Sequence, residues 1–387
     1  MGSDREPDGC RAIDWRNIDQ PLNRKQLLVG MGASGMAVFL AACGSDSGSG
    51  SESSAPAGSG STGLTAEPIK AVTKDPSEMK FRFMTQIDGV PYYQTVEKGA
   101  KTAAQDLGIG SIEVTGPPRV DSSLQVGTVQ TWITQGVDVI AVSSTDPDAM
   151  TPVIDQAIGG GITVVSWDVD APKSKRPVYV NGWDDAVGPK VLFDKFIEDL
   201  GGEGKGEYAF ILPSLTSVTH KAWCQTMLDY QKQKFPDMKL VAQEGCDADQ
   251  TIGNQKAKQL KSKYPDLVGI VSVDAGGTVG IAQATKELGL VGKFANTGLS
   301  TPSQMKAYLK SGVTNHTVLW DPEVTGYLTT VIAHQLLTGK TVKNGQELAV
   351  SSTEKSKIPL KRVNGALQAI QGEPLVFTKD NVDDFSF

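Results

Sequence analysis

The sequence predicts an α/β fold of two doubly wound parallel-sheet domains, joined by a hinge and separated by a ligand cleft. The first observation is that strongly apolar, strand-like segments alternate with helix-like segments from about Met79 onward. Strands that are apolar along their whole length are typical of parallel sheets covered by helices on both faces. The second observation is that the alternation occurs as two series with a similar order, which predicts two similar domains.

The first series starts with an apolar strand at 81–87 and a helix at 92–107. Within this helix, Val96, Ala100 and Ala103 recur at the spacing of one helical face. The remaining elements are expected to be strands at 112–114, 137–143, 162–167 and 178–180, and helices at 122–135 and 149–158. This order predicts one parallel sheet.

The second series begins with a helix at 186–200. Its strands are expected at 208–212, 240–243, 267–273 and 294–297, and its further helices at 221–234, 254–263, 279–288 and 303–310. After a strand at 317–320, a long helix at 325–337 is expected to return and pack on one of the domains. Residues 375–377 are expected to form a closing strand.

These elements divide the folded chain into two lobes. Residues 79–182 together with 318–350 are expected to form the N-terminal lobe, and residues 183–317 together with 351–387 the C-terminal lobe. In open parallel sheets, ligands bind beyond the carboxyl ends of the strands. Two such sheets facing each other would therefore create a small-molecule site between the lobes.

The N-terminal segment is predicted to direct export and lipid attachment. An apolar run at 27–40 follows a basic pair and is shorter than the roughly 20 residues that span a bilayer. The run leads into the sequence Leu-Ala-Ala before Cys43, which resembles a bacterial lipobox. We therefore expect 1–42 to be a signal peptide and Cys43 to carry lipid.

The polar, Gly/Ser-rich sequence after Cys43 predicts a flexible tether, and we assign 43–78 to the lipid-anchor cysteine and this linker. A buried helix that ends in cysteine is the alternative, but so polar a tract cannot continue a hydrophobic core. The basic pair leaves the general and the twin-arginine export routes open. The mature protein is expected outside the cytoplasm, anchored to the outer face of the bacterial cytoplasmic membrane.

Composition and charge exclude several classes of protein. The 387 residues carry a net charge of −7, whereas nucleic-acid binding calls for clustered Lys and Arg. Histidine is scarce and no Cys-x-x-Cys pair occurs, so neither a metal site nor a cofactor is expected. We also expect the protein to be a monomer.

Two cysteines remain in the mature chain besides the lipid site, because Cys10 lies in the leader. Cys224 and Cys246 are expected to form a disulfide, since two cysteines in an oxidising compartment are commonly paired. Two buried thiols that pack as small hydrophobic groups are the alternative.

Polar and aromatic side chains occur just after the predicted strands of the first series. Gln86 ends the first strand and is followed by Tyr92 and Tyr93, Ser143 ends the third strand, and Asp168 follows the fourth. We predict that these side chains bind a ligand. The alternatives are a core position for one tyrosine, a helix or turn cap for Asp168, and a backbone hydrogen bond for Ser143.

The second series has a matching set of candidate ligand-binding residues: His220, Asp274, Ser300 and Trp320. Their alternatives are a structural histidine, a helix cap, a backbone-bonded hydroxyl and packing at the hinge. Carboxylates accept hydrogen bonds from neighbouring hydroxyls, and aromatic faces stack on the C–H face of a sugar. Carboxylate, amide, hydroxyl and aromatic groups together favour a neutral polyhydroxyl ligand over a phosphate.

At these residues the chain resembles the type I periplasmic sugar-binding proteins of ABC importers. The resemblance covers most of the chain from about residue 80 and is carried by the segments 88–93 and 167–170. The nearest subgroup is that of the autoinducer-2 and rhamnose-binding proteins. Its matching stretches are Gly-Leu-Ser-Thr-Pro at 298–302, Leu-Trp-Asp at 319–321 and Val-Phe-Thr-Lys-Asp-Asn at 376–381.

The chain departs from the autoinducer-2 binders at two places. They have a lysine where this chain has Gln86, and an Asp-Gln pair where it has Thr219 and His220. The carboxylates at the positions of Asp168 and Asp274 are kept. The resemblance therefore implies a small polyhydroxylated ligand, and the signal-specific pattern is only partly present.

The resemblance implies a lipid-anchored solute-binding protein of an ABC transporter. It would capture a small sugar or sugar alcohol, such as a tetritol, pentitol, pentose or deoxyhexose, and deliver it to a permease in the cytoplasmic membrane. Binding of an autoinducer-2-type signal, or a chemosensory receptor role, is the alternative. Neighbouring permease and ATPase genes would favour transport.

Two other classes of protein are disfavoured. An enzyme is not expected, because the chain lacks Gly-x-Ser-x-Gly and His-Glu-x-x-His, and no catalytic residue is assigned. The glycine-rich segment 201–206 stands between a helix and a strand, the reverse of the order in a phosphate loop. A sugar-type repressor would need a basic helix-turn-helix where this chain has its leader and tether.

Overall fold

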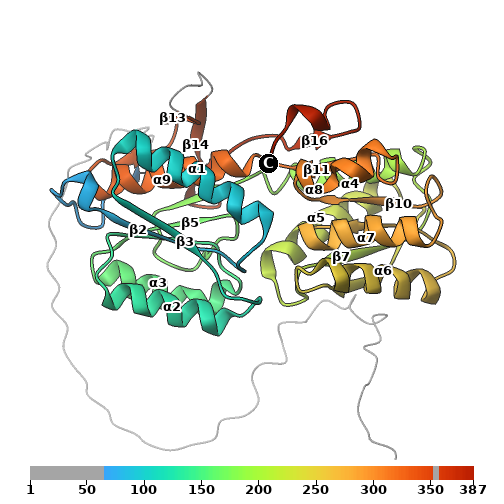
Figure 1. The fold of residues 1–387 in the computed structure, drawn as a ribbon, viewed down its shortest axis with the longest axis horizontal. Helices are drawn as coiled ribbons and strands as arrows, with labels where there is room; N and C mark the ends of the chain where they lie inside the picture. The colour runs from blue at the N-terminus through green and yellow to red at the C-terminus, as the bar shows by residue number, and fades with distance from the viewer. Residues whose placement is uncertain (1–64, 352–356) are drawn as a thin grey trace, which may run out of the picture. The chain divides into compact units, whose positions relative to one another are not determined.

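The computed structural model describes residues 65–351 and 357–387 (Figure 1). The predicted signal peptide, Cys43 and the first part of the predicted linker lie outside these residues. The described chain forms two mainly parallel sheets with helices on both faces, which confirms the predicted α/β class. Within this part of the chain, no helix has both the length and the apolar character needed to cross a bilayer.

The first sheet has eight strands in the order β13-β14-β15-β6-β5-β4-β2-β3. Its strands are β2 (Lys80–Met84), β3 (Ser111–Thr115), β4 (Val139–Val142), β5 (Thr163–Trp167), β6 (Val178–Asn181), β13 (Glu347–Ala349), β14 (Lys357–Val363) and β15 (Ala366–Ile370). All neighbouring strands from β15 to β3 pair in parallel, and β14 is antiparallel to both of its neighbours.

Helices cover both faces of this sheet. α1 (Pro91–Leu107) and α9 (Pro322–Leu337) lie on one face, and α2 (Ser122–Thr134) and α3 (Pro147–Gly159) on the other (Figure 1). Successive residues of one strand enter different cores, since Phe83 packs with the first pair of helices and Met84 with the second. This two-sided burial explains why the strands are apolar along their whole length.

The second sheet has six strands in the order β16-β11-β10-β9-β7-β8. They are β7 (Gly206–Leu212), β8 (Met238–Gly245), β9 (Leu267–Ser272), β10 (Ala295–Leu299), β11 (Thr317–Leu319) and the antiparallel β16 (Leu375–Phe377). The helices are α4 (Gly188–Asp199), α5 (Val218–Lys234), α6 (Gln250–Lys263), α7 (Ala275–Glu287) and α8 (Pro302–Lys310). α4 and α5 pack together, as do α6 and α7, and the two pairs contribute to different cores.

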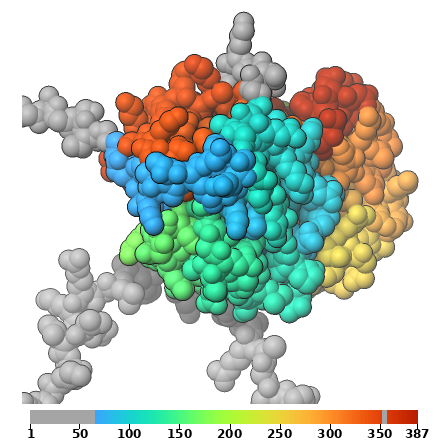
Figure 2. Space-filling view, turned by 60° about the vertical axis from the view of Figure 1, so that its left-hand side comes forward, coloured from blue at the N-terminus to red at the C-terminus, as the bar shows by residue number. Residues whose placement is uncertain are grey.

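The start of the described chain packs against α9 and the strand that follows it. β1 (Thr65–Ala66) pairs in antiparallel fashion with β12 (Val342–Lys343), and Val72 N–H donates to the Leu337 carbonyl at 2.9 Å. Figure 2 shows this N-terminal segment in blue against the orange segment that contains α9 and β12. The N-terminal segment is therefore part of the N-terminal lobe from its first described residues.

The C-terminal tail corrects the expected assignment of 351–387 to the C-terminal lobe. β14 and β15 form a hairpin that extends the first sheet, because β15 pairs in parallel with β6. Only β16 and the residues after it join the second sheet, where β16 pairs with β11. β11 itself also belongs to the second sheet. The chain thus passes between the sheets after β6, after β11 and after β15.

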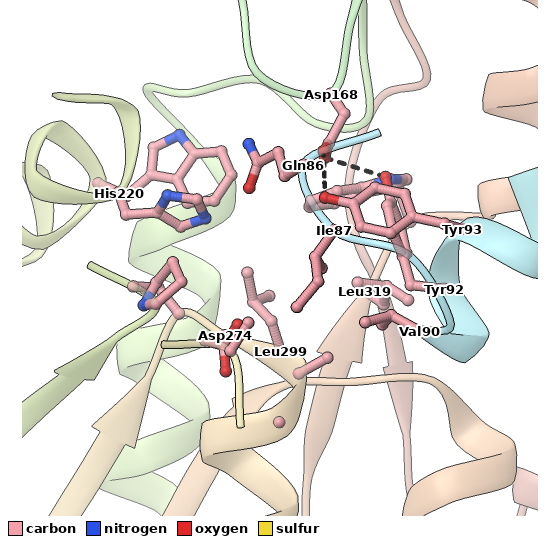
Figure 3. Close-up of a pocket in the computed structure, with 17 residues that line it drawn as sticks. Gln86, Ile87, Val90, Tyr92, Tyr93, Asp168, His220, Asp274, Leu299 and Leu319 are labelled. Atoms are coloured by element: carbon pink, nitrogen blue, oxygen red, sulfur yellow. Dashed lines mark hydrogen bonds between the residues drawn. The ribbon is translucent and has the colours of Figure 1, made fainter. Parts of the chain in front are cut away.

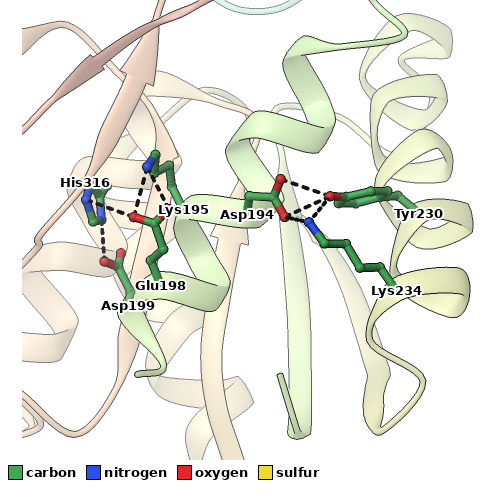
Figure 4. Close-up of polar contacts among 7 residues, drawn as sticks. All are labelled: Asp194, Lys195, Glu198, Asp199, Tyr230, Lys234 and His316. Atoms are coloured by element: carbon green, nitrogen blue, oxygen red, sulfur yellow. Dashed lines mark hydrogen bonds and ion pairs between the residues drawn. The ribbon is translucent and has the colours of Figure 1, made fainter. Parts of the chain in front are cut away.

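Hydrogen bonds and ion pairs of two aspartates on α4 connect this helix to other elements of the C-terminal lobe (Figure 4). Asp194 accepts from Tyr230 Oη at 2.9 Å and from Lys234 Nζ at 3.0 Å, which joins α4 to α5. At the last residue of α4, Asp199 Oδ1 lies 2.6 Å from His316 Nδ1, and its other oxygen accepts from Thr297. The end of α4 is therefore bonded to β10 and to the start of β11.

We expect Asp199→Ala to lower the free energy of unfolding by about 2–3 kcal/mol, because a buried charged acceptor with two partners is lost. Denaturant unfolding followed by circular dichroism measures this change. Asp194→Ala is the matched control on the same helix; its carboxylate is 36% exposed, so the loss should be smaller. Equal losses for the two variants would contradict the prediction.

Candidate ligand-binding site

One cavity lies where the carboxyl ends of strands from both sheets meet, and it holds about 590 Å³ of atom-free space, part of it open to solvent (Figure 3). The residues that line it are Gln86, Ile87, Val90, Tyr92, Tyr93, Asp168, Pro213, His220, Trp223, Ala248, Val273, Asp274, Ala275, Gly276, Leu299, Leu319 and Trp320. The structure thus brings all but two of the predicted ligand-binding residues to one cavity.

Asp168 follows β5 and has a left-handed backbone, with φ of 59°. Such a conformation costs roughly 1–2 kcal/mol in a residue with a side chain. Two hydrogen bonds from β6 hold it: Asp168 N–H donates to the Val180 carbonyl at 3.0 Å, and Tyr179 Oη donates to the Asp168 carbonyl at 2.6 Å. The strand next to β5 therefore fixes the direction in which the Asp168 carboxylate points.

The Asp168 carboxylate is surrounded by hydroxyl donors. Ser143 Oγ donates to Oδ2 at 2.8 Å. Tyr92 Oη donates to Oδ1 at 3.0 Å, and Tyr93 Oη lies 3.5 Å from Oδ2 (Figure 3). Burial raises the pKa of Asp168 to about 6, and the three hydroxyls act in the opposite direction. Burial and the Asp168 charge raise the pKa of both tyrosines, so their hydroxyls remain protonated donors.

Aromatic rings form one wall of the cavity. The Tyr92 ring meets the Trp320 ring edge to face at 5.9 Å, and Trp320 Nε1 donates to Tyr92 Oη at 3.0 Å. Trp320 packs closely over Gly182, where any Cβ atom would lie 2.1 Å from the indole ring. The tryptophan therefore rests on the first crossing between the sheets while it lines the cavity.

His220 and Trp223 line the cavity from the first turns of α5, with ring centroids 4.9 Å apart. α5 begins at Val218 and not at the expected residue 221, so His220 lies in the helix and not in the preceding loop. Its Nδ1 lies 2.7 Å from Ser217 Oγ, and burial lowers the pKa of His220 to about 4. His220 is therefore a neutral ring near pH 7.

Asp274 is the carboxylate that the second sheet contributes to the cavity. It is the N-cap of α7, and its Oδ2 accepts the Gly277 N–H at 2.6 Å and the Cys246 thiol at 3.2 Å. The helix-cap alternative therefore holds, and the same side chain also lines the cavity. Burial raises the pKa of Asp274, whereas the N–H groups at the helix start lower it.

The remaining predicted residues occupy different positions. Gln86 lines the cavity, and its Nε2 donates to the Ser144 carbonyl at 3.2 Å. Ser143 stands behind the cavity as a donor to Asp168. Ser300 is fully buried, does not line the cavity, and has its Oγ 3.4 Å from Gln304 Oε1. The structure therefore gives the Ser300 hydroxyl a neighbour inside the protein, and its contact with a ligand stays a prediction.

The apolar residues that line the cavity were not predicted from the sequence. Ile87, Val90, Leu299 and Leu319 gather on one side of the cavity (Figure 3). Ile87, Leu299 and Leu319 each stand next to a predicted ligand-binding residue, and Val90 lies two residues before Tyr92, so position relative to the strands could have identified them. Trp223 is a further lining residue that was not predicted, although its position one helical turn after His220 was a signal in the sequence. Its Nε1 donates to Asp185 at 2.8 Å.

The charges around the cavity favour a neutral ligand. The lining residues include two carboxylates and neither Lys nor Arg. An anionic ligand would face two acidic groups without a cation to pair with it. Among the described residues, no group of three or more His, Cys, Asp or Glu side chains is arranged to hold a metal ion.

The predicted disulfide is wrong, because Cys224 and Cys246 are free, buried thiols. Cys224 belongs to the core beneath α4 and α5, whereas Cys246 belongs to the core beneath α6 and α7. These cores lie on opposite faces of the second sheet, since alternate residues of β7 enter them. The sheet therefore separates the two sulfur atoms.

Comparisons with known proteins agree with this architecture. A family model described as "Periplasmic binding protein domain" matches residues 81–341, more than half of the chain. The ribose import binding protein RbsB of Bacillus subtilis is 24% identical over 253 residues, which cover 65% of this chain and 80% of the relative.

Two solved structures show the same fold. LsrB from Clostridium saccharobutylicum in complex with AI-2 has a TM-score of 0.75 at 22% identity, covering 80% of this chain and 100% of that one. A solute-binding protein from Clostridium phytofermentas with bound L-rhamnose has a TM-score of 0.72 at 23% identity, covering 81% and 98%. The chain therefore belongs to the periplasmic binding protein domain family, with the type I fold, and this is a family of solute-binding proteins and not of enzymes.

Proposed function

We propose that this protein is the solute-binding component of an ABC importer and captures a small neutral sugar or sugar alcohol. A tetritol, pentitol, pentose or deoxyhexose is the expected ligand, and the receptor delivers it to a membrane permease. The observation that carries the proposal is that Asp168 and Asp274, from two different sheets, line the same cavity, whose lining contains neither Lys nor Arg. Two carboxylates can each accept hydrogen bonds from ligand hydroxyls.

The aromatic and apolar walls support the same class of ligand. Tyr92, Trp223 and Trp320 offer ring faces for C–H groups, while Gln86 and neutral His220 offer further hydrogen-bonding atoms. The relatives named above also support a sugar as the ligand, because RbsB is a ribose import binding protein and one structural neighbour holds L-rhamnose.

Closure about a hinge is the mechanism we propose for ligand capture. Three chain crossings join the sheets, and Gln371 links two of them: its Oε1 accepts the Asp321 N–H at 3.2 Å, and its Nε2 donates to Thr325 Oγ1 at 2.7 Å. A ligand bonded to Asp168 and Asp274 bridges the lobes and therefore stabilises the closed form. The permease would recognise this form.

The proposal includes a lipid anchor at Cys43, as expected from the lipobox-like sequence before it. Intact-mass analysis of protein from its native membrane tests this part. A chain that starts at Cys43 and carries the added mass of lipid supports the anchor. A free thiol at that residue, or an uncleaved leader, contradicts it without affecting the assignment of the ligand.

A thermal-shift screen of the processed protein tests the ligand class. The panel contains tetritols, pentitols, hexitols, pentoses, deoxyhexoses and autoinducer-2, and phosphorylated sugars serve as negative controls. A ligand at 100 times its dissociation constant stabilises the folded state by about 2.7 kcal/mol. A shift with one neutral polyol or sugar supports import of that class, and a shift with autoinducer-2 alone supports the signalling alternative. No shift in folded, ligand-free protein overturns the proposal.

A further inference from the structure

The carboxylate of Asp274 is bonded to a buried thiol in the loop between β8 and α6. Cys246 is fully buried, and its Sγ lies 3.2 Å from Asp274 Oδ2. The same oxygen accepts the Gly277 N–H at 2.6 Å. Both of these contacts therefore fall on one oxygen of a carboxylate that lines the cavity.

The loop that carries the sulfur is held in an unusual conformation. Asp247 and Ala248 both have left-handed backbones, with φ of 52° and 55°. Hydrogen bonds fix the loop from both sides: Cys246 N–H donates to the Leu212 carbonyl at 2.9 Å, and Asp249 N–H donates to the Cys246 carbonyl at 2.9 Å. Two such residues in succession persist only where the surrounding structure holds them. The position of Sγ is thus set by the backbone.

The first turn of α7 packs directly on this loop. A Cβ atom on Gly276 would lie 2.4 Å from the Ala248 carbonyl oxygen, and one on Gly277 would lie 3.1 Å from Cys246 Sγ. The glycines therefore allow the helix start to approach the thiol closely. This contact fixes the separation between the sulfur and the carboxylate that begins the helix.

We infer that Cys246 is a positioning residue for Asp274. Its S–H and the Gly277 N–H hold Oδ2, so the carboxylate keeps one rotamer and Oδ1 is left to accept a ligand hydroxyl. The inference rests on the proposed function for its effect on affinity. The two thiols then have different roles, because Cys224 packs in the other core and Cys246 acts on the ligand-binding carboxylate.

The protonation of the thiol agrees with its role as donor. Burial and the neighbouring Asp274 charge raise the pKa of Cys246 far above its usual value. The sulfur therefore keeps its proton throughout the physiological range and donates it to the carboxylate. A serine at this position would keep a donor, whereas an alanine would remove it.

Affinity measurements on three variants test the inference. With the ligand found in the screen, isothermal titration calorimetry should show about three- to fivefold weaker binding for Cys246→Ala, as for the loss of one weak hydrogen bond. Cys246→Ser should bind within about twofold of the wild type. Cys224→Ala removes a buried thiol of the same lobe and is the matched control; it should lose stability without losing affinity.

A second measurement needs no ligand. In the ligand-free processed protein, ¹³C NMR of labelled aspartate carboxyls follows the titration of Asp274. Loss of the S–H donor should move its midpoint to higher pH in Cys246→Ala, and Cys224→Ala should leave it unchanged. Equal midpoints in both alanine variants, or a Cys246→Ser that matches Cys246→Ala, overturn the inference. If the wild type binds no sugar, the proposed function fails, while this titration still decides the role of Cys246.

Discussion

Asp168→Ala is expected to weaken binding of the sugar or polyol by about a hundredfold or more. Each hydrogen bond to a charged group contributes about 1.5–3 kcal/mol, and two ligand hydroxyls can share this carboxylate. The substitution also removes the acceptor for the hydroxyls of Tyr92, Tyr93 and Ser143, which are then left without this partner. Isothermal titration calorimetry with the ligand from the screen measures the change.

A nearby carboxylate outside the cavity provides the control. Asp146 caps α3 by accepting from the Asp148 and Ala149 N–H groups, and it does not line the cavity. Asp146→Ala should lower stability but leave the dissociation constant within about twofold. An unchanged dissociation constant in Asp168→Ala, or an equal loss in both variants, would show that the cavity is not the ligand site.

Much of the fold could be predicted because burial on both faces leaves a simple pattern in the sequence. The strand at 81–87 and the helix at 92–107 are found as β2 and α1, within a few residues. The sheet that the tail joins could not be predicted, because β14 is half polar and its sequence does not show which strand its hairpin partner β15 pairs with. Its Asn364-Gly365 turn, with φ of 49° and 84°, was the available signal for a hairpin.

The sequence predicts which residues lie near the candidate site, because these residues follow the carboxyl ends of predicted strands. Asp168 follows β5 and Asp274 follows β9, and both are parallel strands, so a rule about the carboxyl ends of parallel strands places both side chains at the cavity. The direction of a side chain depends on local contacts that such a rule does not contain. Ser300 turns inward, and Cys246 bonds to Asp274 across the loop instead of pairing with Cys224.

Affinity for the neutral ligand is expected to fall about tenfold between pH 7 and pH 5. Burial raises the pKa of Asp168 from 3.8 to about 6, so the carboxylate is mostly ionised at pH 7 and about nine-tenths protonated at pH 5. If the ionised form accepts the ligand hydroxyls, the apparent dissociation constant rises as that form becomes scarce. The raised pKa of Asp274 acts in the same direction, while His220 stays neutral because its pKa is about 4.

The stability of the ligand-free protein should respond to Asp168 with the opposite sign. A carboxyl whose pKa is higher in the folded state stabilises the fold below its unfolded value of about 3.8, and this contribution is lost as the pH rises through about 6. Calorimetric titrations at pH 5, 6, 7 and 8 test the change in affinity. Asp168→Asn should bind more weakly at pH 7 and show a much shallower dependence on pH. A wild-type dissociation constant that is the same at pH 5 and pH 7 would mean that ionised Asp168 does not hold the ligand.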